Sequence, residues 1–291
     1  MNAPTVRSWR SKKPDLISVI IPAHNEAVVL PRLLRTLTQD PRGFELLVVC
    51  NGSTDATAAA ARAFPRVRTL ELQTASKHQA LLEGLAAARG AWTIFLDADV
   101  LISTPDLRRL VEPLRTGEAL ACGPRRVIDH TDVSWPVRAY YDVWERLPQV
   151  QSGLFGRGVI ALAPEGVSAF RALPAALSDD LVISESVPPA RRRVVDIVSV
   201  RILPPRTLRD LVRRRARVAT GNAQVDRNRL RSTESQTTMG TLAGLLRQSP
   251  SLAGKVVVFL SVTALARLRA RHAIRSGDVT TWLRDESSRQ G

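Results

Sequence analysis

Cysteine is scarce in this 291-residue chain, which carries Cys50, Cys122 and no others. Two cysteines so far apart in sequence neither form a disulfide framework nor supply a zinc site, and their scarcity fits a reducing cytosol. Aromatic residues make up 4% of the chain, which leaves few side chains to stack on nucleic-acid bases. We therefore expect no nucleic-acid partner, although arginine gives the chain a formal net charge of +15.

Long apolar runs are missing too. No segment approaches the roughly 18 consecutive apolar residues that a membrane-spanning helix needs, and segment 16–21 is too short for the core of a signal peptide. The longest apolar run, 256–266, is followed by Arg267, Arg269 and Arg271. It predicts either a helix packed on the core or an amphipathic helix on an anionic membrane surface. We expect a cytoplasmic protein, and the second alternative places it peripherally at the inner face of the cell membrane.

The chain does contain enough apolar sequence for one large folded unit. Hydrophobic residues make up 44% of it, and its length suits a single large domain with an appendage. We predict a basic tail at 1–14, an α/β domain at 15–225 and a basic, helical C-terminal appendage at 226–291. The polar stretch 227–238 marks the expected boundary.

Short apolar runs alternate with helical patterns through the first half of the chain. Strands are predicted at 16–22, 44–50, 66–72 and 92–97, and helices at 26–37, 54–63, 76–89 and from residue 104. Such alternation predicts a mainly parallel sheet with helices on both faces, which binds ligands at the carboxyl ends of its strands. The second half is less regular, with predicted strands at 119–127, 159–163 and 194–200 and helices at 134–147, from 178, and at 206–220, ending at Gly221.

The predicted strand at 92–97 ends in Asp97, Ala98 and Asp99. Side chains alternate along a strand, so both carboxylates should project from its carboxyl end while Ala98 points away. Adjacent carboxylates repel each other unless a cation lies between them, and oxygen ligands suit Mg²⁺ or Mn²⁺, which commonly hold phosphates. The alternative is one aspartate that caps the next helix beside one that is solvated.

Six short motifs occur in an order similar to that of a known family. They are SVIIPAHNE (18–26), VVCNGSTD (48–55), FLDAD (95–99), SGLFGRG (152–158), SDDL (178–181) and RRARV (214–218). This order resembles the family 2 glycosyltransferases of the GT-A fold over residues 16–222. The resemblance implies a Rossmann-like, mixed and mainly parallel sheet.

The resemblance also implies an activity. It is an inverting, metal-dependent transfer of a hexosyl or N-acetylhexosaminyl group from a nucleotide-diphosphate sugar to an acceptor hydroxyl. The acceptor would be a glycan, a lipid-linked molecule or a small molecule, as in the synthesis of cell-envelope polysaccharides.

The same resemblance assigns roles to the acids. Asp99 is the firmer ligand of a Mn²⁺ or Mg²⁺ ion, and Asp97 is a second ligand that lies nearer the ribose or sugar of the donor. Asp180 takes the position of the base that removes the acceptor's proton, with Asp179 as its fallback. The SDDL motif also suits a helix N-terminus, where serine and aspartate accept hydrogen bonds from free backbone N–H groups.

The ends of the first two predicted strands are expected to hold the nucleotide. The resemblance places in the donor site Pro22, Ala23, His24, Glu26, Asn51, Asp55, Lys77, Ala98 and Arg214. Residues 152–158 resemble the family's glycine-rich acceptor loop, in which Gly153, Gly156 and Gly158 would let the backbone approach the acceptor or the donor sugar closely. The main alternatives are a loop hydrogen bond for His24, a helix cap for Asp55, a favourable first-turn acid for Glu26, a solvated lysine for Lys77 and ordinary turns for the glycines. Asn51 stands where many relatives have aspartate, which leaves the nucleotide base open. Arg157 is a further candidate for a phosphate contact.

The segment with Arg214 and Arg217 lies where the family often has Q-x-x-R-W. An arginine there would stabilise the departing diphosphate through paired donors, and we assign this catalytic role to Arg217. Val218 replaces the tryptophan that lines the glycan channel of processive synthases, so we expect one transfer per acceptor. The alternative is that these arginines form the solvated face of a helix.

Two other functions fit the sequence less well. A nucleotidyltransferase on a similar sheet would need a glycine-rich loop directly after the first strand, and residues 22–26 do not supply one. A basic nucleic-acid-binding protein would need a binding motif or stacking aromatics, which this sequence also lacks.

Overall fold

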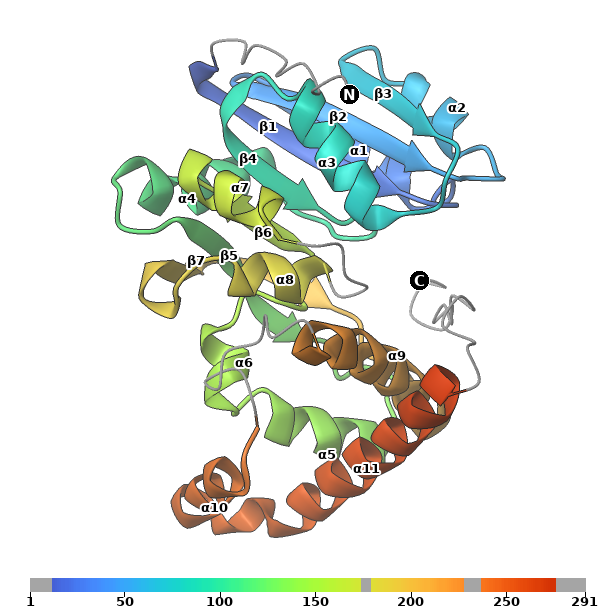
Figure 1. Ribbon diagram of the computed structural model, residues 1–291, viewed down its shortest axis with the longest axis vertical. Coiled ribbons are helices and arrows are strands. Elements are labelled where there is room, and N and C mark those ends of the chain that lie inside the picture. Colours follow the sequence, from blue (N-terminus) through green and yellow to red (C-terminus); the bar gives the residue numbers. More distant parts are fainter. Residues whose placement is uncertain (1–11, 174–178, 228–236, 276–291) are drawn as a thin grey trace, which may run out of the picture.

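The computed structural model describes residues 12–173, 179–227 and 237–275. Within these ranges the chain forms a seven-stranded sheet with the order β3-β2-β1-β4-β6-β5-β7 (Figure 1). Its strands are β1 (Lys13–Ala23), β2 (Phe44–Asn51), β3 (Val67–Leu72), β4 (Gly90–Leu96), β5 (Ala121–Ile128), β6 (Val159–Leu162) and β7 (Arg192–Ile202). Strand β6 is antiparallel to both of its neighbours, β4 and β5, and the other pairings in this sheet are parallel. The predicted mixed, mainly parallel sheet is confirmed.

Helices cover both faces of this sheet. One face carries α1 (Leu30–Gln39), α2 (Thr57–Arg62) and α4 (Thr104–Arg115), and the face toward the viewer in Figure 1 carries α3 (Lys77–Ala87), α7 (Pro164–Arg171) and α8 (Asp179–Glu185). In β1, Val19 and Ile21 pack in the first core cluster while Ile20 packs in the second. Because alternate side chains enter different cores, a strand covered on both faces is apolar throughout.

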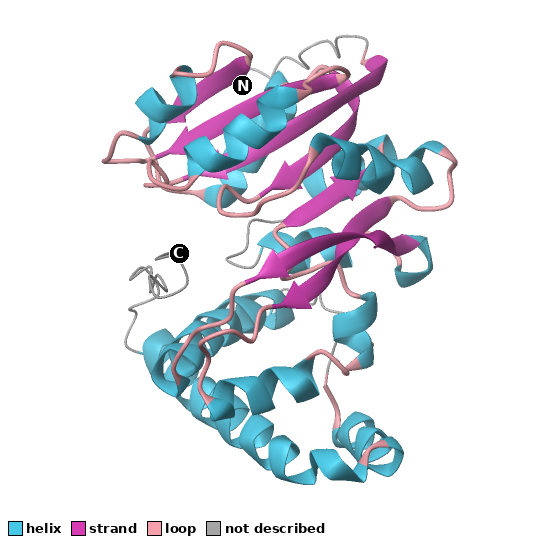
Figure 2. Ribbon diagram, turned by 180° about the vertical axis from the view of Figure 1, so that it is seen from behind, coloured by secondary structure: helices cyan, strands magenta, loops and turns pink. Residues whose placement is uncertain are grey.

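A third core lies among the remaining helices, which stand apart from the upper strands in both views (Figures 1 and 2). They are α5 (Trp135–Trp144), α9 (Leu208–Arg227), α10 (Met239–Gln248) and α11 (Ala253–Arg275), and the short α6 (Pro148–Ser152) follows α5. Tyr140 of α5 stacks on Phe259 of α11 with ring centroids 5.0 Å apart. This core therefore includes helices from both sides of the boundary expected near residue 225. That boundary stays a prediction, and most of the stretch 227–238 lies outside the described residues.

Some predicted helix ends were wrong. The first helix begins at Leu30 rather than at 26, and the second at Thr57 rather than at 54, because a turn precedes each helix. Helix α9 does not end at Gly221 but continues to Arg227, since its packing against α11 outweighs the weak helix propensity of one glycine.

The apolar run 256–266 belongs to a much longer helix. By length and composition alone, Pro250–Arg275 is the one helix among the described residues that could cross a membrane, and 28% of its apolar window is buried. The longest apolar run within this helix is still 256–266, which Lys255 and Arg267 border, as expected from the sequence. Arginine and alanine extend the helix beyond the apolar run because both are good helix formers.

Candidate active site

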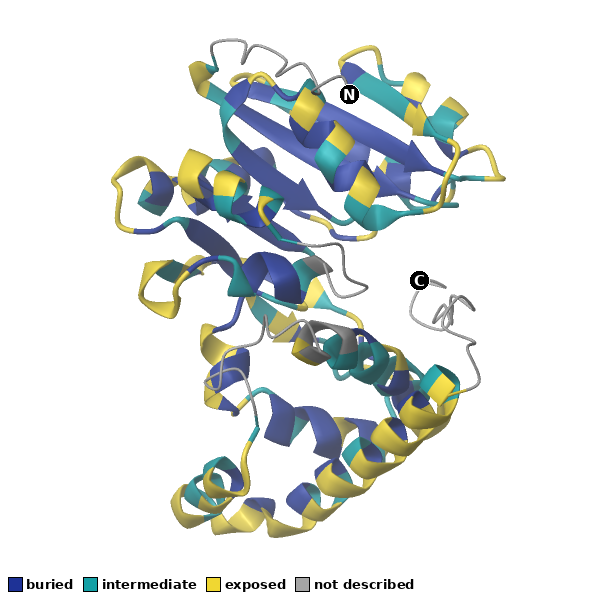
Figure 3. Cartoon of the chain, viewed as in Figure 1, coloured by how far each residue is buried: buried dark blue, intermediate teal, exposed yellow. Residues whose placement is uncertain are grey.

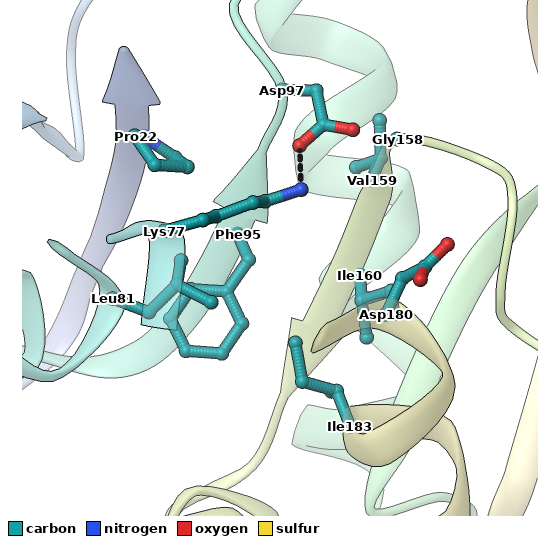
Figure 4. A pocket seen from close by; sticks show the side chains of 10 residues that line it. All are labelled: Pro22, Lys77, Leu81, Phe95, Asp97, Gly158, Val159, Ile160, Asp180 and Ile183. Carbon is teal, nitrogen blue, oxygen red and sulfur yellow. Dashed lines mark hydrogen bonds and ion pairs between the residues drawn. The ribbon is translucent and has the colours of Figure 1, made fainter. Parts of the chain in front are cut away.

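A pocket opens at the carboxyl end of β1 and β4, at the edge where a parallel sheet is expected to bind its ligands. Side chains from β1, α3, β4, β6 and α8 line it: Pro22, Lys77, Leu81, Phe95, Asp97, Gly158, Val159, Ile160, Asp180 and Ile183. In Figure 4 the acids Asp97 and Asp180 lie on either side of the start of β6, above apolar side chains such as Phe95 and Ile183. The pocket thus has a charged rim and an apolar floor.

The two aspartates that follow β4 differ in their surroundings. Asp97 is partly buried, its backbone N–H donates to the Gly158 carbonyl at 2.8 Å, and its Oδ1 accepts from Lys77 Nζ at 2.6 Å. Asp99 is exposed, and Ala98 between them is buried in the core. The chain therefore turns Asp97 and Asp99 outward and Ala98 inward.

The electrostatics of Asp97 show that negative charge gathers at this point. Burial raises the pKa of the Asp97 carboxyl above its usual value, the ammonium of Lys77 opposes this effect, and the nearby carboxylates of Asp99 and Asp180 add to it. Lys77 is about one-third exposed and places one positive charge beside the cluster of Asp97, Asp99 and Asp180. Such a cluster favours the arrival of a further cation.

Asp180 lies in the first turn of α8, where its carboxylate accepts two backbone hydrogen bonds. Oδ2 accepts from Gly156 N–H at 2.6 Å, and Oδ1 accepts from Leu181 N–H at 3.0 Å. Asp179 begins the same helix, but its side chain lies outside the described residues. Asp180 therefore has the position of a helix-terminal acid and also lines the pocket beside Asp97.

The loop between α6 and β6 requires glycine at three positions, for different structural reasons. Gly156 and Gly158 adopt positive φ angles of 64° and 66°, which side-chain-bearing residues rarely adopt. A Cβ on Gly158 would lie 2.4 Å from Val100 Cγ2 and 3.4 Å from Asp97 Oδ2. Gly153 instead ends α6, and a Cβ there would lie 2.5 Å from the Gln149 carbonyl oxygen. The conformation of Gly158 thus allows β6 to begin directly beside Asp97.

The loops after β1 and β2 hold each other through short polar side chains. His24 Nδ1 lies 2.7 Å from the Asn51 carbonyl oxygen, and Asn25 Oδ1 accepts from Thr54 N–H at 2.8 Å. Asn25 has a positive φ of 52°, and its role was missed although asparagine is among the residues that tolerate this conformation. Pro22 lines the pocket and Ala23 is buried at the end of β1. The two predicted nucleotide loops are therefore brought together at the edge of the sheet.

Glu26 and Asp55 have structural contacts in the same region. Glu26 is buried, and its N–H donates to Thr57 Oγ1 at 2.8 Å. Asp55 accepts from Thr57 N–H at 3.0 Å and from Ala27 N–H at 3.2 Å, so it stabilises the turn before α2, whose N-cap residue is Ala56 and not Asp55. Burial acts to raise the pKa of Asp55, but hydrogen bonds from Thr57 and Ala27 outweigh it and hold the pKa below the usual value.

The arginines of α9 are not among the described side chains that line the pocket. Arg214 Nη1 donates to the Leu203 carbonyl oxygen at 3.1 Å, and Arg217 is exposed. Their neighbour Arg215 lies over the ring of Tyr140, 5.6 Å from its centroid. Roles for Arg214 and Arg217 at the diphosphate remain predictions.

The interpretation of Arg157 as a phosphate contact was wrong. Its side chain is only 2% exposed and donates to backbone carbonyl oxygens of Pro124, Gln151 and Gly153. Arg126, which sequence reasoning missed, also reaches this loop and donates to Phe155 O at 2.9 Å. Alternation of side chains along β5 could have predicted this contact, because Arg125 is exposed and the next residue, Arg126, therefore turns toward the protein.

The acids fit a metal ion only together with a phosphorylated ligand. Among the described residues, no group of three His, Cys, Asp or Glu side chains is placed to hold a metal by itself. Mg²⁺ and similar hard ions often bind through one or two carboxylates plus substrate phosphates, with water completing the shell. Asp97 supplies a carboxylate of that kind at the pocket, and Asp99 lies close enough to interact with it.

Curated proteins match this chain over limited stretches. The undecaprenyl-phosphate 4-deoxy-4-formamido-L-arabinose transferase of Pseudomonas aeruginosa is 34% identical over 113 residues, 35% of this chain and 33% of that protein. The succinoglycan biosynthesis protein ExoO of Rhizobium meliloti is 34% identical over 137 residues, 46% of this chain and 36% of that protein. This chain thus spans about a third of the length of these relatives.

A likeness in structure extends over most of the chain. A mannosyltransferase from Pyrobaculum calidifontis, solved with GDP-Man and Mn²⁺, matches with a TM-score of 0.61 and 19% identity over 94% of this chain and 83% of that one. At this identity the match establishes the fold, which is GT-A. The sequence model described as glycosyl transferase family 2 matches residues 18–172, just over half of the 291 residues. This chain therefore belongs to glycosyl transferase family 2, the family that its order of motifs predicted.

Proposed function

We propose that this protein transfers one sugar from a nucleotide-diphosphate sugar to an acceptor hydroxyl, with inversion at the anomeric carbon. The convergence of Asp97, Asp99 and Asp180 carries the proposal, because these acids come from two distant parts of the chain and meet at one end of the sheet. Membership of glycosyl transferase family 2 supports sugar transfer as the reaction.

Asp180 is the proposed base. As the acceptor oxygen attacks, its proton passes to the Asp180 carboxylate, which the N–H groups of Gly156 and Leu181 hold in place. The oxygen forms a bond to the anomeric carbon while that carbon's bond to the diphosphate breaks. Attack from the face opposite the leaving group inverts the configuration. Asp179 precedes Asp180 on α8 and remains the alternative base.

The donor is proposed to lie across the loops after β1, β2 and β4. Backbone and side chains of the first two loops would hold the base and ribose, including Pro22, Ala23, His24, Glu26, Asn51 and Asp55. Lys77 would stabilise the diphosphate, and Arg217 is the second candidate for that role. We propose a hexosyl or N-acetylhexosaminyl group as the transferred sugar.

Asp99 and Asp97 are the proposed ligands of a divalent metal. A bound Mn²⁺ or Mg²⁺ ion would neutralise the charge that develops on the departing diphosphate. Mn²⁺ is the first choice, because it accompanies GDP-Man in the Pyrobaculum mannosyltransferase of the same fold.

Calorimetry with UDP-, GDP- and TDP-sugars, each with and without Mn²⁺, tests this proposal. We expect one nucleotide class to bind and Mn²⁺ to tighten its binding. Mass spectrometry of the product made with a cell lipid extract should then show the gain of one sugar. Release of pyrophosphate from a nucleoside triphosphate would instead indicate a nucleotidyltransferase.

We also propose that the acceptor is lipid-linked and that α11 rests on an anionic membrane surface. The matched Pseudomonas protein is named as an undecaprenyl-phosphate transferase, which supports an acceptor of this kind. Val256, Phe259 and Val262 on one side of α11 are buried in the third core. The outward side remains apolar, with Val257 63% and Leu268 60% exposed, and Figure 3 shows the exposed residues along this helix.

Charge favours a membrane as the partner of this outward side. Arg267, Arg269 and Arg271 are exposed beside Leu268, and basic residues near an anionic surface contribute about 1 kcal/mol each. An apolar stripe bordered by arginine is typical of helices that lie in a membrane interface. Such a position would place the protein at the inner face of the cell membrane.

Co-sedimentation with phosphatidylglycerol vesicles tests the membrane proposal. We expect the protein to sediment with these vesicles, and a Val257→Glu/Leu268→Glu variant to stay in the supernatant. Ile197→Glu is the matched control, because Ile197 is 77% exposed on β7 and should not affect sedimentation. Equal sedimentation of all three proteins would exclude α11 as the contact surface.

A further inference from the structure

Two arginines lie beneath the loop that joins α6 to β6. Arg157 is buried, and its guanidinium donates to Pro124 O at 2.6 Å, Gln151 O at 2.9 Å and Gly153 O at 2.8 Å. Among the described residues its hydrogen bonds go to backbone carbonyl oxygens alone, including a longer one to Val150 at 3.5 Å. Arg157 therefore holds the backbone in place through hydrogen bonds and forms no ion pair with an acid among the described residues.

Arg126 of β5 completes the arrangement from the other side. It donates to Phe155 O at 2.9 Å and also to Val150 O. Its guanidinium lies over the Trp144 ring, 4.7 Å from the centroid, and over the Phe155 ring at 5.8 Å. Between them the two arginines engage the carbonyl groups of residues 150, 151, 153 and 155.

With their carbonyl groups bound on one side, residues of the same loop direct backbone N–H groups toward α8. Gly156 N–H donates to Asp180 Oδ2 at 2.6 Å, and Leu154 N–H donates to Ser184 Oγ at 3.1 Å. Both acceptors lie on α8. The carbonyl groups are thus bound by the arginines while two N–H groups of the loop bind the helix that carries Asp180.

The arrangement carries two cations without an ion-pair partner among the described residues. Burial lowers the pKa of Arg157 to about 9 and that of Arg126 to about 10, so both are still charged at neutral pH. Buried charge is unfavourable unless hydrogen bonds satisfy it, and here the loop carbonyls do so. The carboxylates of Glu145 and, to a smaller extent, Asp180 also lie near enough to Arg126 to attract its charge.

We infer that Arg126 and Arg157 are positioning residues, which hold the loop so that Gly156 N–H fixes the Asp180 carboxylate where it receives the acceptor's proton. The inference depends on the proposed role of Asp180. Neither arginine touches the donor or the acceptor in this scheme. Their loss should therefore lower kcat and leave donor binding unchanged.

Conservative replacement by lysine tests the inference, because lysine keeps the charge but cannot bind several carbonyl groups with one planar group. For Arg126→Lys and Arg157→Lys we expect kcat to fall roughly 10- to 100-fold, the scale of effect that misplacing a catalytic group produces. Donor Kd from calorimetry should stay within twofold. Arg125→Lys is the matched control on the same strand, because Arg125 is exposed and should behave as the native protein does.

Each outcome decides the question. If Arg157→Lys does not fold, Arg126→Lys carries the test, because Arg126 is only half-buried. A folded Arg126→Lys with native kcat overturns the inference, and so does a parallel loss of donor binding, which would indicate general disruption of the loop. Asp180→Asn separates this from the proposed function. If Asp180→Asn is inactive and Arg126→Lys is fully active, only the positioning role fails, whereas an active Asp180→Asn refutes the base itself.

Discussion

Two loops on the donor side of the site hold each other, whereas the loop on the acceptor side is held from beneath by one buried and one half-buried arginine. The donor side consists of the loops after β1, β2 and β4, and the acceptor side of loop 153–158 and helix α8. His24 and Asn25 join the first two loops through hydrogen bonds of 2.7 and 2.8 Å. On the acceptor side, Arg126 and Arg157 instead bind backbone carbonyls and direct Gly156 toward Asp180.

The difference follows from topology. Parallel neighbours β1, β2 and β4 end at the same edge of the sheet, so their loops meet without further support. Loop 153–158 leads into β6, which is antiparallel to β4 and enters the sheet from that edge. It must also meet α8, which follows in sequence only after α7. Additional interactions are needed to hold such a loop, and Arg126 and Arg157 supply them.

The largest effects should come from removing one acid on each side. Asp180→Asn should lower kcat by roughly 10²- to 10⁴-fold, the usual contribution of a general base, with donor affinity unchanged. Asp99→Ala should also abolish transfer, but through weaker binding of the donor in the presence of Mn²⁺. Product formation and calorimetric Kd, measured on the same preparations, distinguish these two kinds of loss.

Glu83→Gln serves as the control for both variants, because Glu83 is an exposed acid on α3. If Asp99→Ala bound the donor normally in Mn²⁺, Asp99 would not be a metal ligand. If Asp180→Asn lost donor binding, the separation of the site into a donor side and an acceptor side would be wrong.

Gly158 joins the two sides, and its replacement should affect stability next. A Cβ in Gly158→Ala would lie 2.4 Å from Val100 Cγ2 at a φ of 66°. Gly117→Ala is the matched variant, since Gly117 has a φ of 76° but no heavy atom within 4 Å of its Cβ position. Both should lose about 1–2 kcal/mol for the left-handed backbone, and Gly158→Ala about 1–3 kcal/mol more for overpacking. Urea denaturation measures the difference, and equal losses would show that Val100 moves aside.

The sequence predicted the donor side well because its signals are local. The order of strands brings the polar loops to one edge. Asp97 and Asp99 turn outward and Ala98 inward as expected, although these residues lie in the turn after β4, which ends at Leu96, and not on the strand itself. The helix cap considered for Asp55 was one residue off, because Ala56 takes the N-cap position and Asp55 accepts from Thr57 N–H in the turn before the helix.

The acceptor side was harder to predict because its contacts join distant residues. Arg157 stands in a polar, glycine-rich loop, where an arginine is ordinarily solvated, and nothing local indicates that it is buried. Arg126 contacts Phe155, and Gly156 contacts Asp180, across 29 and 24 residues respectively. The predicted end of α9 at Gly221 was wrong for a similar reason, because tertiary packing and not local helix propensity determines where this helix ends.

The smallest predicted effect compares two donor-side acids whose pKa values move in opposite directions. The pKa of Asp97 is raised above 3.8 in the folded protein, so the folded state binds this proton more tightly than the unfolded state does. The contribution of Asp97 to the free energy of unfolding is therefore present at low pH and is lost as the pH rises through the raised pKa. Asp55 has the reverse sign, because its pKa is lowered and its contribution is lost as pH falls.

Replacing each acid by asparagine should therefore change stability in opposite senses. At pH 8 Asp97→Asn should be more stable than the native protein toward urea, and Asp55→Asn less stable. The difference for Asp97→Asn should shrink as the pH falls through the raised pKa of Asp97, where the native carboxyl group takes up its proton. The difference for Asp55→Asn should persist at pH 4 and shrink only below the usual value of 3.8, because the pKa of Asp55 is lowered. Lys77 is about one-third exposed and stays hydrated when its partner loses charge, so it should not cancel the gain from Asp97→Asn. A loss of stability in Asp97→Asn at pH 8 would mean that the ion pair with Lys77 outweighs the repulsion among the three acids. The donor side would then need no further cation to be stable.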